Sequence, residues 1–351
     1  MYTRRTYKAT ELAMWTRFET LKFFLIIMVC VSVYYFLDLE WFRIPWTPLA
    51  LIGTAVAFII GFQNNAAYDR IWEARKIWGG IVNTSRTLGM YVQDMLTNEY
   101  AKSKFPEEKI REEIKTLTYR HIGWMTALRH AMRVQKQWET TFNQKTNQEW
   151  GIRPPERDSN LVDDLKPYLS AQDLEDAMAK DNKQTALLYQ QSHHLRNLKE
   201  SGMIWEFGFL ELEGLLQELF NLQGKSERIK NFPYPRQFAT LNHNFMWILL
   251  LLLPIALVPQ FADIGNEISS THPVLGDFFI WLSVPIYTAV AWIFHTMERI
   301  GRTGENPFEG TSNDVPISTI ARGIEIDLRQ NLGEKNADIP EQFPSQYNVQ
   351  F

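Results

Sequence analysis

The sequence has little of the chemistry on which most enzymes depend. Its 351 residues include one cysteine, Cys30, and seven histidines. A single thiol excludes an intrachain disulfide and a cysteine-based metal site. No histidines have zinc-motif spacing, and the adjacent His193 and His194 would point to different faces of a helix. No glycine-rich phosphate loop or nucleophile motif is visible. We therefore expect no enzyme activity, no catalytic residues and no cofactor.

Charged residues are absent from four stretches, which are Phe23–Leu37, Ile44–Tyr68, Gln237–Ala262 and Phe278–Met297. A helix needs roughly 20 residues to cross the hydrocarbon core of a membrane, and three of the stretches reach that length. The first is shorter, but Lys22 can extend it by reaching toward the headgroups. Its far end also lacks the small residues of a signal-peptide cleavage site. The sequence therefore predicts an all-α membrane protein with four transmembrane helices.

The distribution of basic residues predicts the orientation. With a cytoplasmic amino terminus, the outer loops are Asp38–Arg43 and Asp263–Asp277, and Arg43 is their only basic residue out of 36 lysines and arginines. Basic residues concentrate on the cytoplasmic side of membrane proteins. We expect a multi-pass protein of the cell membrane, or of the inner membrane if it is bacterial, with both termini cytoplasmic. The net charge of −4 does not indicate a nucleic-acid partner.

The rest of the chain predicts a large cytosolic helical bundle. Apolar residues recur at helical spacing between Ile110 and Leu128, and a second helix is expected from about Asn182 to Gln223. Pro154 and Pro155 interrupt the helices between them. The polar tail from Asn331 is expected to be extended, against a neighbour or frayed. The expected segments are a cytosolic N-terminal segment (1–19), two transmembrane helices (20–68, with a pore neck in 48–66), a cytosolic domain (69–236), two more transmembrane helices (237–298) and a cytosolic C-terminal segment (299–351).

The second uncharged stretch carries two stripes at four-residue spacing. One consists of small residues and lets another helix approach closely. The other would point elsewhere, since a shift of one position turns the direction by about 100°. The small stripe is Gly53, Ala57 and Gly61, and the other is Thr54, Phe58 and Phe62. Around an axis, several copies of the second stripe would form a narrow hydrophobic constriction that gates ions. Ordinary core packing is the alternative.

Three polar residues, Gln63, Asn64 and Asn65, follow at the expected inner end of the neck. Exposure to lipid would be costly for them, so they favour a wet or protein-lined environment. Pore lining and hydrogen bonding between helices both satisfy this requirement.

The run from Gly61 to Arg75, GFQNNAAYDRIWEAR, resembles the bestrophin family, and most closely its bacterial members. A second run from Glu305 to Asp314, ENPFEGTSND, resembles the segment after the last span of the family. The resemblance implies a homopentameric channel assembled around a central pore, with a neck and a second, cytosolic constriction. The implied neck residues are Thr54, Phe58 and Phe62, and the implied cytosolic aperture lies near Ile204 and Trp205. Thr54 departs from the family, which usually has a larger apolar residue there.

Animal members of the family bind calcium with the segment after the last span. Asn306 and Asp314 fit that pattern, but few carboxylates stand between them. Calcium takes six to eight oxygen ligands, including several carboxylates. We therefore expect conduction without calcium, and turn or capping roles for Asn306 and Asp314.

Two features of the sequence favour permeating ions of opposite charge. The acidic residues of the outer loops, repeated fivefold, would concentrate cations; they are Asp38, Glu40, Asp263, Glu267 and Asp277. The edges of the neck phenylalanines are weakly electropositive and would suit anions. We expect passive conduction of small monovalent ions in the lipid bilayer, with chloride favoured by the resemblance and sodium or potassium as the alternative. A non-conducting scaffold and a membrane-embedded enzyme are the alternatives of other classes.

Overall fold

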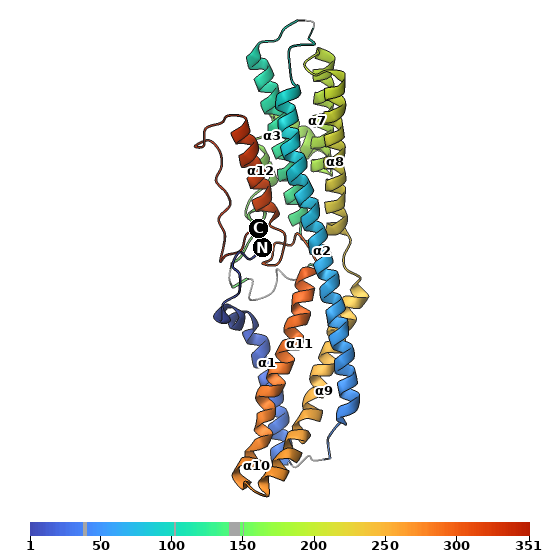
Figure 1. Ribbon diagram of the computed structural model, residues 1–351, viewed down its shortest axis with the longest axis vertical. Coiled ribbons are helices and arrows are strands. Elements are labelled where there is room, and N and C mark those ends of the chain that lie inside the picture. The colour runs from blue at the N-terminus through green and yellow to red at the C-terminus, as the bar shows by residue number, and fades with distance from the viewer. Residues whose placement is uncertain (38–40, 102, 140–147, 150) are drawn as a thin grey trace. The chain divides into compact units, whose positions relative to one another are not determined.

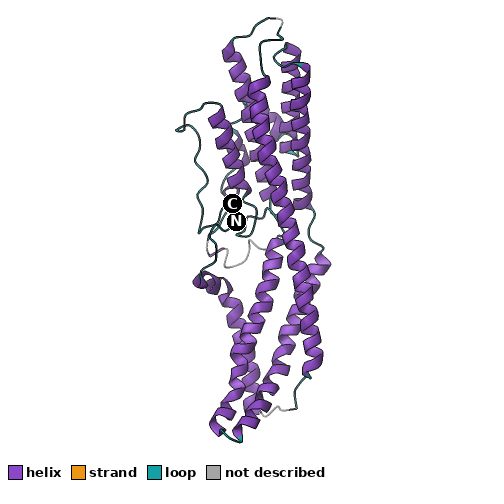
Figure 2. Ribbon diagram, viewed as in Figure 1, coloured by secondary structure: helices purple, strands orange, loops and turns teal. Residues whose placement is uncertain are grey.

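The computed structural model describes residues 1–37, 41–101, 103–139, 148–149 and 151–351. Within them the regular structure is helical, and Figure 2 contains no strand in the part of the chain that it describes. The chain forms two compact units. We call residues 4–69 and 233–305 the membrane unit, and residues 1–3, 70–232 and 306–351 the polar unit. Each is described separately below.

The membrane unit is built from long apolar helices. They are α1 (Ala9–Leu37), the first half of α2 (Trp46–Met95), α9 (Arg236–Ser269), α10 (Pro273–Phe279), η3 (Ile280–Leu282) and α11 (Ser283–Gly304). In the part of the chain that the structure describes, four helical stretches are long and apolar enough to cross a membrane, namely Ala9–Leu37, Trp46–Met95, Arg236–Ser269 and Pro273–Gly304. The expected four transmembrane helices are therefore confirmed. In Figure 1, α11 packs between α1 and α9.

A hydrogen bond repairs the backbone of α9 where proline interrupts it. Pro254 has no N–H group, so the carbonyl of Leu250 loses its helical donor four residues on. The hydroxyl of Tyr287, on α11, donates to this carbonyl at 2.8 Å. Tyr287 is fully buried. An unpaired carbonyl is costly in an apolar environment, so this bond stabilises the contact between α9 and α11.

The polar unit is a bundle of shorter amphipathic helices. They are the second half of α2, α3 (Glu107–Arg133), η2 (Pro155–Arg157), α5 (Leu161–Leu165), α6 (Ala171–Met178), α7 (Lys183–Ser201), α8 (Glu206–Asn231) and α12 (Ile317–Asn331). Trp78, Trp124 and Phe308 are among the largest side chains of its buried core. Arg70, on α2, donates to the carbonyls of Ile229 and Phe232 at 3.1 and 2.9 Å, which caps the end of α8.

The single helix expected from Asn182 to Gln223 is wrong, because the chain turns between α7 and α8. Gly202 has a φ of +84° at the end of α7, and its N–H donates to the carbonyls of Leu198 and Lys199. A side chain at this position would also approach the carbonyl oxygen of Tyr100 within 2.8 Å. Glycine is therefore required by both its conformation and its neighbour.

The C-terminal tail packs on its own chain rather than fraying. Its last residue, Phe351, is buried, and the carbonyl of Phe351 accepts from the N–H of Thr319 at 2.7 Å. The N–H of Tyr2 donates to the carbonyl of Ser312 at 2.7 Å. Both termini are thus held in the polar unit.

Candidate ion pathway

The implied neck residues lie on an exposed face of α2, which we call the bare face. Phe58 and Phe62 are 64% and 70% exposed, and Thr54 is exposed as well. The opposite face of the helix is buried in the core of the membrane unit through Leu49, Val56 and Ile60. Within this chain, therefore, the stripe of Thr54, Phe58 and Phe62 does not serve core packing. It requires lipid or further protein chains as its surroundings.

The small-residue stripe also lies partly on the bare side of α2. A side chain placed at Gly53 would contact Leu249 at 3.6 Å, but one placed at Gly61 would meet nothing within 4 Å. Ala57 is exposed. Only Gly53 therefore contacts the rest of the chain, and the other two positions leave room for a neighbouring helix.

Two of the three polar residues expected at the inner end of a neck bind other helices. Gln63 is 1% exposed; its Nε2 donates to Oε1 of Glu305 at 2.7 Å, and its Oε1 accepts from Nδ2 of Asn242 at 3.2 Å. Asn64 donates to the carbonyls of Ile60 and Met297. Asn65 is exposed, so it alone of the three lies on the bare face.

A buried carboxylate binds Gln63 and an arginine. Glu305 is 1% exposed, and its Oε2 accepts from Nη2 of Arg236 at 2.8 Å. Burial raises the pKa of Glu305, although its bonds to Gln63 and Arg236 oppose that rise. Gly301 permits close contact here, since a side chain at that position would lie 3.0 Å from Oδ1 of Asn64. Sequence reasoning did not identify Glu305 and Arg236 as part of this site. The signal that could have indicated them is Gln63, because an amide inside a span requires a polar partner.

The two residues of the implied cytosolic aperture are placed differently. Ile204 is 2% exposed and belongs to the core of the polar unit. Trp205 is 40% exposed, and its ring stacks on that of Tyr100 with centroids 6.0 Å apart. Of this pair, only Trp205 offers a surface to a pore.

Asp314 holds the loop after the last span by accepting hydrogen bonds from the chain itself. Its carboxylate accepts from the N–H groups of Phe308, Gly310 and Val315 at 2.8, 2.7 and 2.6 Å. Arg133 donates both to Asp314 and to the carbonyl of Phe308, at 3.2 and 3.0 Å. Phe308 adopts a φ of +74°, which these contacts and its complete burial maintain. This is the turn role expected for Asp314.

No metal cluster accompanies this loop. Among the described residues, no group of three or more His, Cys, Asp or Glu side chains could hold a metal ion. Asn306 is buried, and its Oδ1 has no hydrogen-bond partner in the described part of the chain. Sequence reasoning missed Arg133, whose guanidinium supplies a fixed positive charge beside Asp314.

Of the five acidic residues expected in the outer loops, the structure describes three. Asp38 and Glu40 lie outside the described residues. Asp263 forms an exposed ion pair with Arg43 at 3.6 Å. The expected loop Asp263–Asp277 is largely helical, because Asp263 and Glu267 lie on α9 and Asp277 lies on α10.

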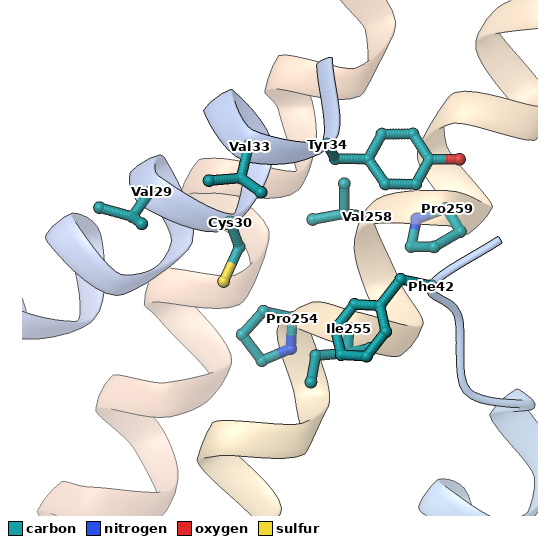
Figure 3. A pocket seen from close by; sticks show the side chains of 9 residues that line it. All are labelled: Val29, Cys30, Val33, Tyr34, Phe42, Pro254, Ile255, Val258 and Pro259. Carbon is teal, nitrogen blue, oxygen red and sulfur yellow. The ribbon is translucent and has the colours of Figure 1, made fainter. Parts of the chain in front are cut away.

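The membrane unit has an apolar cavity of about 130 Å³. Figure 3 shows the side chains that line it. It lies between α1 and α9, and the sulfur of Cys30 lies across it from Pro254. Val258 and Pro259 line it on the side of α9. No residue of α2 is among the described residues that line it. This cavity is therefore separate from the candidate pathway.

Comparison with known proteins identifies the family. The family model described as Bacterial/Fungal Bestrophin protein matches residues 16–330. The chain is similar to a voltage-dependent anion channel-forming protein of Ralstonia nicotianae, with 30% identity over 288 residues, or 82% of this chain and 78% of that protein. It is also similar to a voltage-dependent anion channel-forming protein of Escherichia coli, with 25% identity over 85% of this chain and 83% of that one.

Solved structures agree in fold. A bacterial bestrophin homologue from Klebsiella pneumoniae superimposes with a TM-score of 0.72 at 19% identity, covering 91% of this chain and 98% of that chain. The family match spans most of the sequence and contains both motifs, the one in the middle of α2 and the one after α11. The chain therefore belongs to the bestrophin family, among its bacterial and fungal members.

Proposed function

We propose that this chain forms a homopentameric channel that passively conducts small monovalent anions, with chloride as the expected ion. The observation that carries the proposal is the bare face of α2. Thr54, Phe58 and Phe62 are exposed along it at a spacing of one helical turn, while the other face is buried. Five such faces around an axis would form a hydrophobic neck that ions pass only after partial dehydration.

Lipid alone is a poor surrounding for this face. Asn65 continues it with an exposed amide, which would be costly in hydrocarbon. Ala57 and Gly61 beside it have no large side chain to meet acyl chains, but they suit close helix contact. A water-filled axis bordered by neighbouring copies of α2 satisfies the polar and the small residues together.

The polar unit provides further surface for assembly. Several of its large apolar side chains are exposed, including Tyr189, Phe207 and Leu210 at 60%, 64% and 56%. Exposed apolar groups of this kind favour contact between copies. We place the second constriction of the pathway at Trp205, the exposed member of the implied aperture pair. Both termini are proposed to be cytoplasmic, because Arg43 is the only basic residue of the outer loops.

The names of the relatives support anions over cations. Both relatives compared above are named as anion channel-forming proteins. The argument for sodium or potassium depended on an acidic outer ring, and the pairing of Asp263 with Arg43 weakens that ring. Family membership and these channel names point to an ion channel rather than an enzyme. Flux distinguishes a channel from a scaffold.

The test is current across a planar bilayer containing the purified protein, with potassium chloride at different concentrations on the two sides. An anion channel gives a reversal potential near the equilibrium potential of chloride. A value near that of potassium would establish the cation alternative instead.

Liposomes that contain the protein and show no flux in any salt would leave only the scaffold. A monomer or dimer in mild detergent, measured by native mass spectrometry, would contradict a central pore.

A further inference from the structure

The polar unit contains a cavity of about 440 Å³. None of the residues named for the candidate pathway is among the described residues that line it. α3, the 155–168 segment, α12 and the C-terminal tail all contribute to its lining. Three arginines line it, Arg129, Arg322 and Arg329. The volume falls in the range of small-molecule sites, about 300 to 1,000 Å³.

Two of the three guanidinium groups are already occupied by acceptors. Arg129 donates to Glu156 and, at 3.2 Å, to Asp164. Arg329 donates to Glu334 and to the carbonyl of Asp338, both at 2.7 Å. These bonds fix both side chains as parts of the wall.

Arg322 differs from the other two. Its side chain is only 14% exposed, and its one ion pair is with Glu325, 3.5 Å away. Oε1 of that carboxylate accepts from the hydroxyl of Tyr168 at 2.7 Å and from Arg329 at 3.4 Å, and Oε2 is the oxygen nearest to Arg322. In the described part of the chain, the guanidinium of Arg322 makes no hydrogen bond. It lies 4.4 Å from the centroid of the Phe343 ring.

A guanidinium has five N–H donors in a planar fork that matches a carboxylate. Arg322 therefore presents unused donors to the cavity, where an acceptor from a ligand would form a charge-assisted hydrogen bond. The ring of Phe343, which also lies 5.5 Å from Arg129, holds this fork in place from the tail side.

The surrounding charges limit the ligand to one negative charge. Asp163 and Asp164 also line the cavity, but Asp163 pairs with Lys166 at 2.6 Å and Asp164 is bonded to Arg129 and His130. Asp338 lines it with an exposed carboxylate that would repel an anion. With one unused guanidinium and acidic neighbours, a dianion such as phosphate is poorly compensated. The remaining wall includes Pro155, Pro167 and Phe343, which suit an apolar body.

We propose that this cavity binds a small organic carboxylate. The carboxylate accepts hydrogen bonds from Arg322, and the apolar body packs on the prolines and the Phe343 ring. The tail segment from Ala337 to Phe343 forms part of the site, so the ligand joins the tail to α12. The site is independent of the neck and of the proposed function.

The test is isothermal titration of the purified full-length protein in detergent with three probes. Benzoate carries the carboxylate, benzamide is its neutral counterpart, and inorganic phosphate, titrated at about pH 8.5, is the dianion. We expect saturable binding of benzoate, no measurable binding of benzamide, and phosphate binding at least about tenfold weaker than benzoate. Arg322→Gln should weaken benzoate binding at least about tenfold, while Arg196→Gln, at an exposed arginine of α7, should leave it unchanged.

A second variant keeps the test valid if Arg322→Gln folds poorly. Asp338→Asn removes an exposed carboxylate at the wall and should strengthen benzoate binding, which loss of folding cannot imitate. Benzamide binding as tightly as benzoate, or no benzoate binding at about 10 mM, would overturn the proposal. So would undiminished binding in a folded Arg322→Gln protein. Phosphate binding more tightly than benzoate would overturn the assignment to carboxylates.

Discussion

At the scale of the residue, Phe58 is the sharpest test of the neck. Phe58→Ala should raise the rate of anion flux into proteoliposomes, because a wider and less hydrophobic ring is more easily hydrated. Phe24→Ala is the matched control, since Phe24 is an exposed aromatic residue on α1. It should leave the flux unchanged. Unchanged flux in Phe58→Ala would remove Phe58 from the gate.

Glu156 is a residue on which the polar unit depends for stability. Its side chain is fully buried beside Arg129 and Arg133. Burial acts to raise the pKa of Glu156, but the two arginines outweigh it and lower that pKa below its ordinary value of 4.5. Glu156→Gln would leave both arginines short of a counter-charge. We expect a loss of about 3 to 5 kcal/mol in the free energy of unfolding at pH 7.

The sign of the pH dependence follows from the lowered pKa. The stability that the Glu156 carboxylate contributes is present above the ordinary pKa of 4.5 and is lost as the pH falls through the folded-state value. The difference in stability between wild type and Glu156→Gln should therefore be complete above pH 4.5 and should shrink as the pH falls below 4.5 toward the folded-state pKa. A difference that stays constant from pH 7 to pH 3 would show that the charge of Glu156 is not its source.

At the scale of the element, the bond from Tyr287 to α9 predicts coupling between two substitutions. Tyr287→Phe leaves the carbonyl of Leu250 without a donor, at a cost of about 1 to 3 kcal/mol in stability. With Pro254→Ala, residue 254 regains an N–H that can serve the same carbonyl. Tyr287→Phe should then cost less, as measured by thermal unfolding of all four proteins in detergent. Equal costs in both backgrounds would mean that the hydroxyl does not replace the helical donor.

The helices show how far sequence reasoning reaches. The absence of charge predicted the four spans because each can be recognised from its own residues. The break at Gly202 was missed because it lies in an apolar pattern that continues on both sides. Its cause is partly remote, since the neighbour that excludes a side chain is the backbone at Tyr100. The partners of Gln63 were unpredictable for the same reason: Asn242 and Glu305 are 179 and 242 positions away.

At the scale of the whole molecule, we expect conduction that does not require calcium. The oxygens of Asp314 already accept from three backbone N–H groups, and Arg133 supplies positive charge beside them. Calcium would have to displace these donors to bind there. Anion flux into proteoliposomes should be the same with a calcium chelator as with added calcium. Flux that stops on chelation and returns with calcium, but not with magnesium, would contradict this.

The thiol of Cys30 beside the apolar cavity of the membrane unit makes the chain a single-cysteine protein without any engineering. A thiol reagent small enough to enter the cavity, such as methyl methanethiosulfonate, can add at most one mass increment to each chain. The number of increments on an intact particle then counts its subunits directly. Five would be the stoichiometry of a pentamer, read from the wild-type protein itself.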